Sequence, residues 1–208
     1  MKKLLYLFIC LTVAGCSPPE YLTAEELTKY ISDPDHGLVQ HAEVNGYSMD
    51  VTYKPTDLLV LQEAGDHADD LKITALRDKY SKYCYFILSL SKNSKEALHQ
   101  VEPNQYGDLV QTLSFRMGGY VNMTTSLHDT IPTTDFVLDR TYGLSSVTSL
   151  LFVFDREKAK DKDWVQFNLN EFGLGVGNQR FRFRIKDLEN TPKIKFEVSK
   201  SQTRNERP

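Results

Sequence analysis

The spacing of apolar side chains changes near residue 118. Before this point apolar residues recur every three or four positions, which predicts amphipathic helices, and after it they alternate with polar residues, which predicts half-buried strands. Thr23 and Glu26 have capping-box spacing, which predicts a first helix that ends at Asp33. Further helices are expected over 55–63, 69–82 and 105–117.

A hairpin is predicted where Asn45-Gly46 separates two alternating segments, 38–44 and 47–53, because both central turn residues need positive φ. Residues 83–90 are almost wholly apolar and predict a buried central strand. Strands are also expected over 120–125, 135–140, 147–154, 164–170, 180–187 and 193–199. The order of elements predicts an α+β fold, in which N-terminal helices and the hairpin pack with a mainly antiparallel C-terminal β-sheet.

The N-terminus has the organisation of a secretory signal peptide. Lys2 and Lys3 precede an uncharged and mostly apolar run over 4–13, and the small residues Ala14 and Gly15 follow. A helix of this length spans roughly half of a ~30 Å hydrocarbon core, so it suits export better than permanent insertion.

The segment Val13-Ala14-Gly15-Cys16 resembles the lipobox of bacterial lipoproteins. The resemblance implies cleavage before Cys16 and a diacylglycerol on its sulfur, which gives stable attachment to a membrane. A serine after the cysteine implies the outer membrane. No acidic run of the kind that marks surface export in some Bacteroidota follows, so the periplasmic face is expected. The alternative is an ordinary signal peptide with a coincidental cysteine.

The resemblance divides the chain into a signal peptide (1–15), a lipidated tether (16–22), one α+β domain (23–200) and a polar tail (201–208). About 190 residues remain after cleavage, enough for one sizeable domain. No family is recognised for this domain. Because Cys10 leaves with the signal and Cys16 is lipidated, Cys84 has no intramolecular partner and is expected to be a buried thiol.

Charge is distributed unevenly. Residues 17–155 hold 10 Lys/Arg against 20 Asp/Glu, whereas residues 156–208 hold 13 against 8. This excess of positive charge can attract an anionic partner to the C-terminal part, or it can complement the acidic part of the same chain. Nucleic acid is not expected as a partner of an exported protein.

The most distinctive candidate surface is a ladder of basic residues, Arg180, Arg182, Arg184 and Lys186. A period of two places all four on one strand face, with Phe181 and Phe183 on the other. If the next strand adds Lys193 and Lys195, a basic sheet face results that can bind an anionic partner. The alternative is a solvated face whose arginines pair with carboxylates of neighbouring strands.

Three other segments carry candidate chemistry. Asp66, His67, Asp69 and Asp70 are concentrated enough to suggest a metal site, but their spacing fits neither calcium nor zinc, and helix capping explains them better. The glycine-rich segment 173–177 lacks the lysine and helix of a nucleotide loop, so a flexible hairpin connection is expected. The alternative is a contact tip formed by its glycines and by exposed Leu174 and Val176. Asp129-Thr130-Ile131 resembles the O-glycosylation motif of Bacteroidota, which implies a glycan on Thr130.

No catalytic or cofactor motif is found. A Gly-x-Ser-x-Gly elbow, a His-Glu-x-x-His pair and a recognisable Cys–His spacing are all missing from the sequence. We therefore expect a non-enzymatic binding or accessory lipoprotein that contacts another envelope protein or a glycan. The alternative is an envelope hydrolase that acts on a glycan through two carboxylates, because such a pair is defined by distance in space rather than along the chain.

Overall fold

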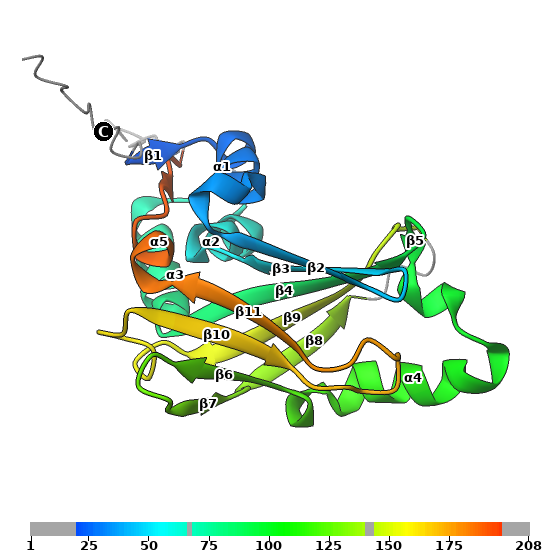
Figure 1. Cartoon of the computed structure of the whole chain (residues 1–208). Helices are drawn as coiled ribbons and strands as arrows, with labels where there is room; N and C mark the ends of the chain where they lie inside the picture. The colour runs from blue at the N-terminus through cyan, green and yellow to red at the C-terminus, as the bar shows by residue number, and fades with distance from the viewer. Residues whose placement is uncertain (1–19, 66–67, 140–143, 197–208) are drawn as a thin grey trace, which may run out of the picture.

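The computed structural model describes residues 20–65, 68–139 and 144–196. Its elements form two mainly antiparallel β-sheets that pack against each other, with helices around them (Figure 1). This arrangement confirms the predicted α+β class. The signal peptide, Cys16, Asp66, His67 and the polar tail lie outside the described residues.

The larger sheet has six strands and follows the order β2-β3-β4-β9-β8, with β5 paired to β4. Its strands are β2 (Val39–Val44), β3 (Tyr47–Tyr53), β4 (Tyr83–Lys92), β5 (Lys95–Glu96), β8 (Asp135–Asp139) and β9 (Thr148–Asp155). The predicted hairpin is β2–β3, and its turn residues Asn45 and Gly46 have φ of 53° and 78°. The predicted central strand is β4, which is hydrogen-bonded to β3 and β9.

The smaller sheet has four antiparallel strands in the order β11-β10-β6-β7. They are β6 (Val121–Thr125), β7 (Thr130–Pro132), β10 (Trp164–Leu169) and β11 (Gln179–Arg184). The C-terminal strands are thus divided between two sheets, and β8 and β9 join the N-terminal hairpin in the larger one. Alternation predicts which face of a strand is buried, but it does not specify which strands pair.

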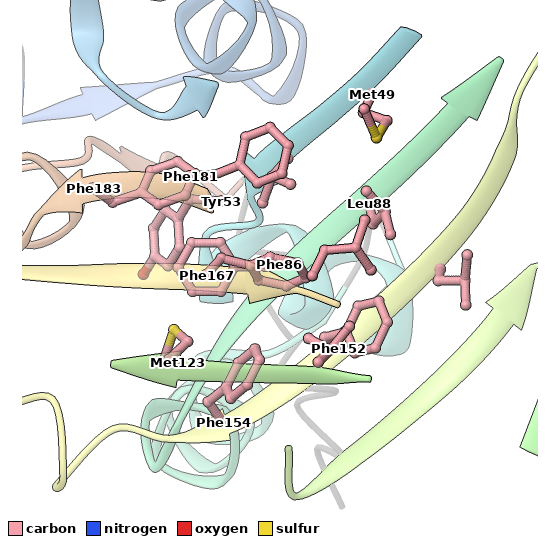
Figure 2. Packing of buried hydrophobic residues seen from close by; sticks show 14 of the residues in the cluster. Met49, Tyr53, Phe86, Leu88, Met123, Phe152, Phe154, Phe167, Phe181 and Phe183 are labelled. Atoms are coloured by element: carbon pink, nitrogen blue, oxygen red, sulfur yellow. The ribbon is translucent and has the colours of Figure 1, made fainter. Parts of the chain in front are cut away.

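The main hydrophobic core lies between the two sheets (Figure 2). Phe86 of β4 packs on Phe183 of β11 with ring centroids 5.0 Å apart, and Phe152 of β9 packs on Phe167 of β10 at 5.5 Å. All four rings are at most 1% exposed. Since each aromatic pair adds about 0.5–1.5 kcal/mol beyond area burial, these contacts hold the small sheet firmly on the large one.

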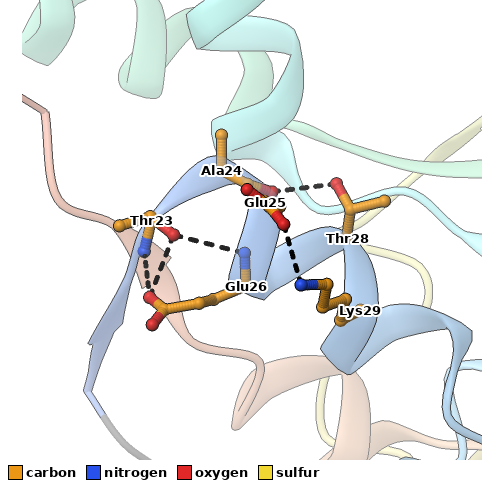
Figure 3. A network of polar contacts seen from close by, with 6 residues as sticks. All are labelled: Thr23, Ala24, Glu25, Glu26, Thr28 and Lys29. Atoms are coloured by element: carbon orange, nitrogen blue, oxygen red, sulfur yellow. Dashed lines mark hydrogen bonds and ion pairs between the residues drawn. The ribbon is translucent and has the colours of Figure 1, made fainter.

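The helices are α1 (Ala24–Ser32), α2 (Thr56–Ala64), α3 (Asp70–Ser81), α4 (Pro103–Phe115) and α5 (Ile185–Glu189), with short 3₁₀ turns η1 (Pro34–His36), η2 (Ala97–Gln100) and η3 (Met117–Gly119). The predicted capping box begins α1. The Thr23 backbone nitrogen donates to Glu26 Oε2 at 2.9 Å, and the Glu26 nitrogen donates to Thr23 Oγ1 at 3.2 Å (Figure 3). The bonds that Thr23 donates to the Glu26 carboxylate, from its backbone nitrogen and from its hydroxyl, lower the pKa of Glu26.

The N-terminal and C-terminal parts of the described chain are joined by a short parallel pair, β1 (Tyr21–Leu22) and β12 (Lys193–Ile194). Residues 21–22, which the sequence assigns to the tether, thus pair with a strand near the C-terminal end of the described chain. Buried Asp57 of α2 strengthens this junction, because it accepts from Arg77 at 2.6 Å and from the Ile194 backbone nitrogen at 2.7 Å. Among the described residues, no helix combines the length and apolarity needed to cross a membrane.

Candidate binding surface on the small sheet

The small sheet has one apolar and one polar face. On β10 and β11 the side chains of Val165, Phe167, Leu169, Phe181 and Phe183 are buried against the large sheet. The opposite face carries the residues that alternate with them. We call it the amide–arginine face, and it consists of Asn122, Thr124, Trp164, Gln166, Asn168, Arg180, Arg182 and Arg184.

The guanidinium of Arg182 lies over the indole ring of Trp164. Its guanidinium carbon lies 4.0 Å from the ring centroid, and its Nη2 donates to Gln166 Oε1 at 3.0 Å. The strand register pairs Arg182 with Gln166 directly and with Trp164 diagonally, so the sheet itself fixes this geometry. A cation–π contact and a hydrogen bond together restrict an arginine that is otherwise exposed to solvent.

A row of hydrogen-bonded amides continues from Gln166 across the sheet. Gln166 Nε2 donates to Asn168 Oδ1 at 2.8 Å, and Asn168 Nδ2 donates to Asn122 Oδ1 at 2.9 Å and to Thr124 Oγ1 at 3.4 Å. The row fixes the orientation of each amide group. Within the described part of the chain, the Asn122 amide nitrogen makes no hydrogen bond and faces away from the core.

The charges of this face are only partly neutralised. Arg184 forms an ion pair with Asp187 at 2.6 Å. No carboxylate of the described residues lies within 4.0 Å of Arg180 or Arg182, because the adjacent strand offers Asn168 and Gln166 at those positions. Among the described residues, the carboxylate pairing that the alternative expects is present at Arg184 and is not seen at Arg180 or Arg182.

The predicted extent of the ladder also needs correction. Strand β11 ends at Arg184, and Lys186 lies in α5 rather than on the strand face. Lys193 lies in β12, which pairs with β1, and neither it nor Lys195 extends the small sheet. Ile185 and Leu188 are three apart and both buried, which is helical spacing that the preceding alternation obscured.

The glycine-rich connection is not an exposed tip. Leu174 and Val176 are 8% and 1% exposed and belong to the main core, contrary to the contact-tip alternative. The Glu171 carboxylate accepts from the backbone nitrogens of Gly173 at 2.8 Å, Gly175 at 2.9 Å and Gly177. Positive φ at all three glycines turns these N–H groups toward one carboxylate, and the apolar side chains between them turn inward.

The acidic segment before α3 contains a helix cap. Asp69 is the N-cap of α3 and accepts from the Lys72 backbone nitrogen at 2.7 Å, as the capping interpretation predicts. In the portion of the chain that the structure describes, no group of three or more His, Cys, Asp or Glu side chains is arranged to hold a metal ion.

Thr130 is exposed and begins the short edge strand β7, where it lies opposite Thr124. It therefore borders the amide–arginine face. The neighbouring Asp129 lies 3.7 Å from Lys162. The glycan on Thr130 stays a prediction.

The arginines are recognisable as candidates from the sequence, whereas the residues that orient them are not. Trp164, Gln166, Asn168 and Asn122 are neutral, so a search for charge does not find them. Their signal was the regular alternation of 164–170, whose outward positions are all large and polar or aromatic. Strand pairing alone brings Asn122 to this row, and no sequence signal shows that pairing.

Comparisons with known proteins do not identify a family. No family model and no curated protein matches the chain. Among solved structures, it is similar to a protein of unknown function from Burkholderia pseudomallei, with 10% sequence identity, a TM-score of 0.36 and coverage of 82% of this chain and 93% of that one.

Proposed function

We propose that this protein is a non-enzymatic binding lipoprotein of the cell envelope, and that its amide–arginine face binds an acidic glycan. In this proposal, lipid on Cys16 holds the domain at the outer membrane, facing the periplasm. The observation that carries the binding proposal is the pair Arg180 and Arg182, which project from a sheet face and have no carboxylate partner among residues 20–65, 68–139 and 144–196. The anchoring rests on the lipobox resemblance of residues 13–16.

The chemistry of the face suits a polyhydroxylated anion. Amide groups both donate and accept hydrogen bonds, as sugar hydroxyls do, so the row from Gln166 to Asn122 can satisfy neighbouring hydroxyls. Guanidinium groups bind carboxylates with two parallel hydrogen bonds. A glycan that carries carboxylates along its length would use both sets of groups at once.

A protein partner is less well matched to this face. Protein interfaces usually have an apolar, aromatic-rich centre and a polar rim. Here the centre is made of amides, and the half-buried Trp164 is covered by Arg182. The composition therefore favours a hydrated polar ligand over a protein surface.

The hydrolase alternative has no comparable support. A catalytic acid needs a carboxyl group with a raised pKa. Hydrogen bonds from Lys79 and Tyr80 lower the pKa of Glu63. Burial raises the pKa of Glu171, but hydrogen bonds from the backbone of Gly175, Gly177 and Gly173 outweigh burial and leave it below its usual value.

The test compares polygalacturonate with the same polymer after reduction of its carboxyl groups. Binding to the purified, detergent-solubilised lipoprotein is measured by biolayer interferometry. We expect Arg182→Gln to weaken binding of the acidic polymer at least tenfold. The matched control is Arg116→Gln, because exposed Arg116 also donates to a glutamine, Gln111, at 3.2 Å but lies at the end of α4.

Three results would contradict the proposal. The acidic polymer does not bind the wild type, the reduced polymer binds equally well, or the two arginine variants lose affinity to the same extent. If an acidic protein binds the amide–arginine face and the acidic polymer does not, the partner of this face is a protein.

A further inference from the structure

A separate hollow lies at the end of the sandwich where α3 leads into β4 and β9 ends. Its volume is about 430 Å³, within the range of small-molecule sites. Its lining includes residues of α5 and none of the amide–arginine face. The lining residues are Ser81, Lys82, Cys84, Asp155, Arg156, Glu157, Ala159, Lys160, Ile185, Leu188 and Glu189.

The inner wall of the hollow is apolar. Cys84, Ala159, Ile185 and Leu188 line it, and each is at most 8% exposed. Burial raises the pKa of the Cys84 thiol, so this group is neutral and adds no charge to the wall. Such a wall offers van der Waals contact to a hydrocarbon and no hydrogen bonds.

Arg156 is the polar group within this wall. Its Nη2 donates to the Tyr53 hydroxyl at 3.0 Å and its Nε donates to the Tyr83 carbonyl at 3.3 Å. Both acceptors are neutral. The Tyr83 acceptor is a backbone carbonyl, and burial raises the pKa of the Tyr53 hydroxyl to about 12. No carboxylate oxygen of the described residues lies within 4.0 Å of the guanidinium. Glu189 acts on this cation only at longer range, so the remaining N–H groups of the half-buried guanidinium can bind an anion.

The rim of the hollow limits the charge of that anion. Asp155, Glu157 and Glu189 line it together with Lys82 and Lys160. Glu157 lies 3.7 Å from Lys160, so one lysine is already partly neutralised. Together with Arg156 the rim holds three cations and three carboxylates, so it has no surplus positive charge to balance a doubly charged phosphate and suits a singly charged carboxylate better.

We infer that this hollow binds a small amphipathic monocarboxylate, with its carboxylate on Arg156 and its hydrocarbon chain against Cys84, Ala159, Ile185 and Leu188. A volume of about 430 Å³ equals roughly fourteen water volumes at ~30 Å³ each. Because a methylene group is about the size of a water molecule, a medium-length chain such as octanoate fits. This site is independent of the proposed glycan binding, because it uses none of the same residues.

The test uses the mature chain, residues 16–208, with Cys16→Ser, which carries neither the apolar signal segment nor lipid and so needs no detergent. Octanoate, 1-octanol and octyl phosphate are titrated, and the methyl resonances of Ala159, Ile185 and Leu188 are followed by NMR. We expect octanoate to shift these resonances saturably and to bind at least tenfold more tightly than either of the other two ligands. Equal affinity for octanol, tighter binding of octyl phosphate, or no shift at these methyl groups would overturn the inference.

Two variants test the role of charge. Arg156→Gln should weaken octanoate binding at least tenfold, whereas Arg182→Gln on the small sheet should leave it unchanged. Glu189→Gln lowers the negative charge at the rim without touching the Arg156 hydrogen bonds, so it should tighten octanoate binding several-fold. This second variant keeps the inference testable if Arg156→Gln does not fold. Unchanged or weaker binding by Glu189→Gln would count against the assigned charge of the ligand.

Discussion

Replacing Glu171 by alanine should destabilise the domain by about 2–4 kcal/mol. The carboxylate accepts three backbone hydrogen bonds from the glycine-rich connection. Hydrogen bonds to charged groups contribute ~1.5–3 kcal/mol when buried, but Glu171 is half-buried and water replaces part of each bond, so about 1 kcal/mol apiece is appropriate. Partial loss of the core contacts of Leu174 and Val176 adds to this value.

The measurement is urea unfolding of the wild type and Glu171→Ala, followed by far-UV circular dichroism. The matched control is Glu157→Ala, because Glu157 is also a C-terminal-half glutamate but its side chain is 79% exposed and pairs only with Lys160. The control should change the free energy of unfolding by less than about 0.5 kcal/mol. Equal effects of the two substitutions would show that the glycine-rich connection folds without its central carboxylate.

The difference in stability between wild type and Glu171→Ala should also depend on pH. The pKa of Glu171 is lower in the folded state than in the unfolded chain, where it is about 4.3. Its contribution to stability is therefore complete above the unfolded value and is lost as the pH falls through the folded value. The difference between wild type and Glu171→Ala should narrow below about pH 4. A difference that stays constant at low pH would mean that the charge is not what holds the glycines.

Other predictions concern the core, the thiol and the anchor. Phe167→Ala should cost about 4 kcal/mol and lower the Tm by roughly 8–16 °C in calorimetry, because the ring is fully buried between the sheets; a shift under 2 °C would contradict the packing. Cys84 is 4% exposed and its pKa is raised by burial, so iodoacetamide should label it only as fast as the protein opens; rapid labelling of native protein would refute this. Cys16→Ser should abolish palmitate incorporation in cells, and incorporation that persists in this variant would contradict lipidation at Cys16.

Local signals in the sequence predicted local structure well. The capping box at Thr23 and Glu26, the Asn45-Gly46 turn and the central strand at 83–90 depend on neighbouring residues, and each is present in the structure. The division of the strands into two sheets depends on contacts between distant residues, such as Phe86 with Phe183. Alternation gives every strand one apolar face and so fits several pairings equally well.

Two errors have specific physical causes. The strand predicted through Asp187 ends at Arg184, because the buried Ile185 and Leu188 favour a helical turn and Asp187 pairs with Arg184. The glycine-rich connection was expected to be exposed because glycine predicts flexibility. The sequence pattern does not indicate that Glu171 binds this connection, although Glu171 lies only two residues before the first glycine. A carboxylate close to several glycines in positive φ is the signal that could have revealed this closed loop.

The rigidity of the small sheet supports the glycan binding that we propose for its amide–arginine face. Phe167 and Phe183 fix β10 and β11 against the large sheet from behind, and Gln166, Asn168 and Arg182 project from the same two strands in front. Fixing a rotamer-rich side chain costs ~0.5–1.5 kcal/mol on binding. The Trp164 stack and the amide row already order these side chains in the folded protein, so part of this cost does not arise on binding. A hydrated, flexible polymer already loses entropy when it binds. A face whose side chains are ordered in advance can therefore hold such a polymer through a few weak contacts, whereas an equally charged but mobile surface could not.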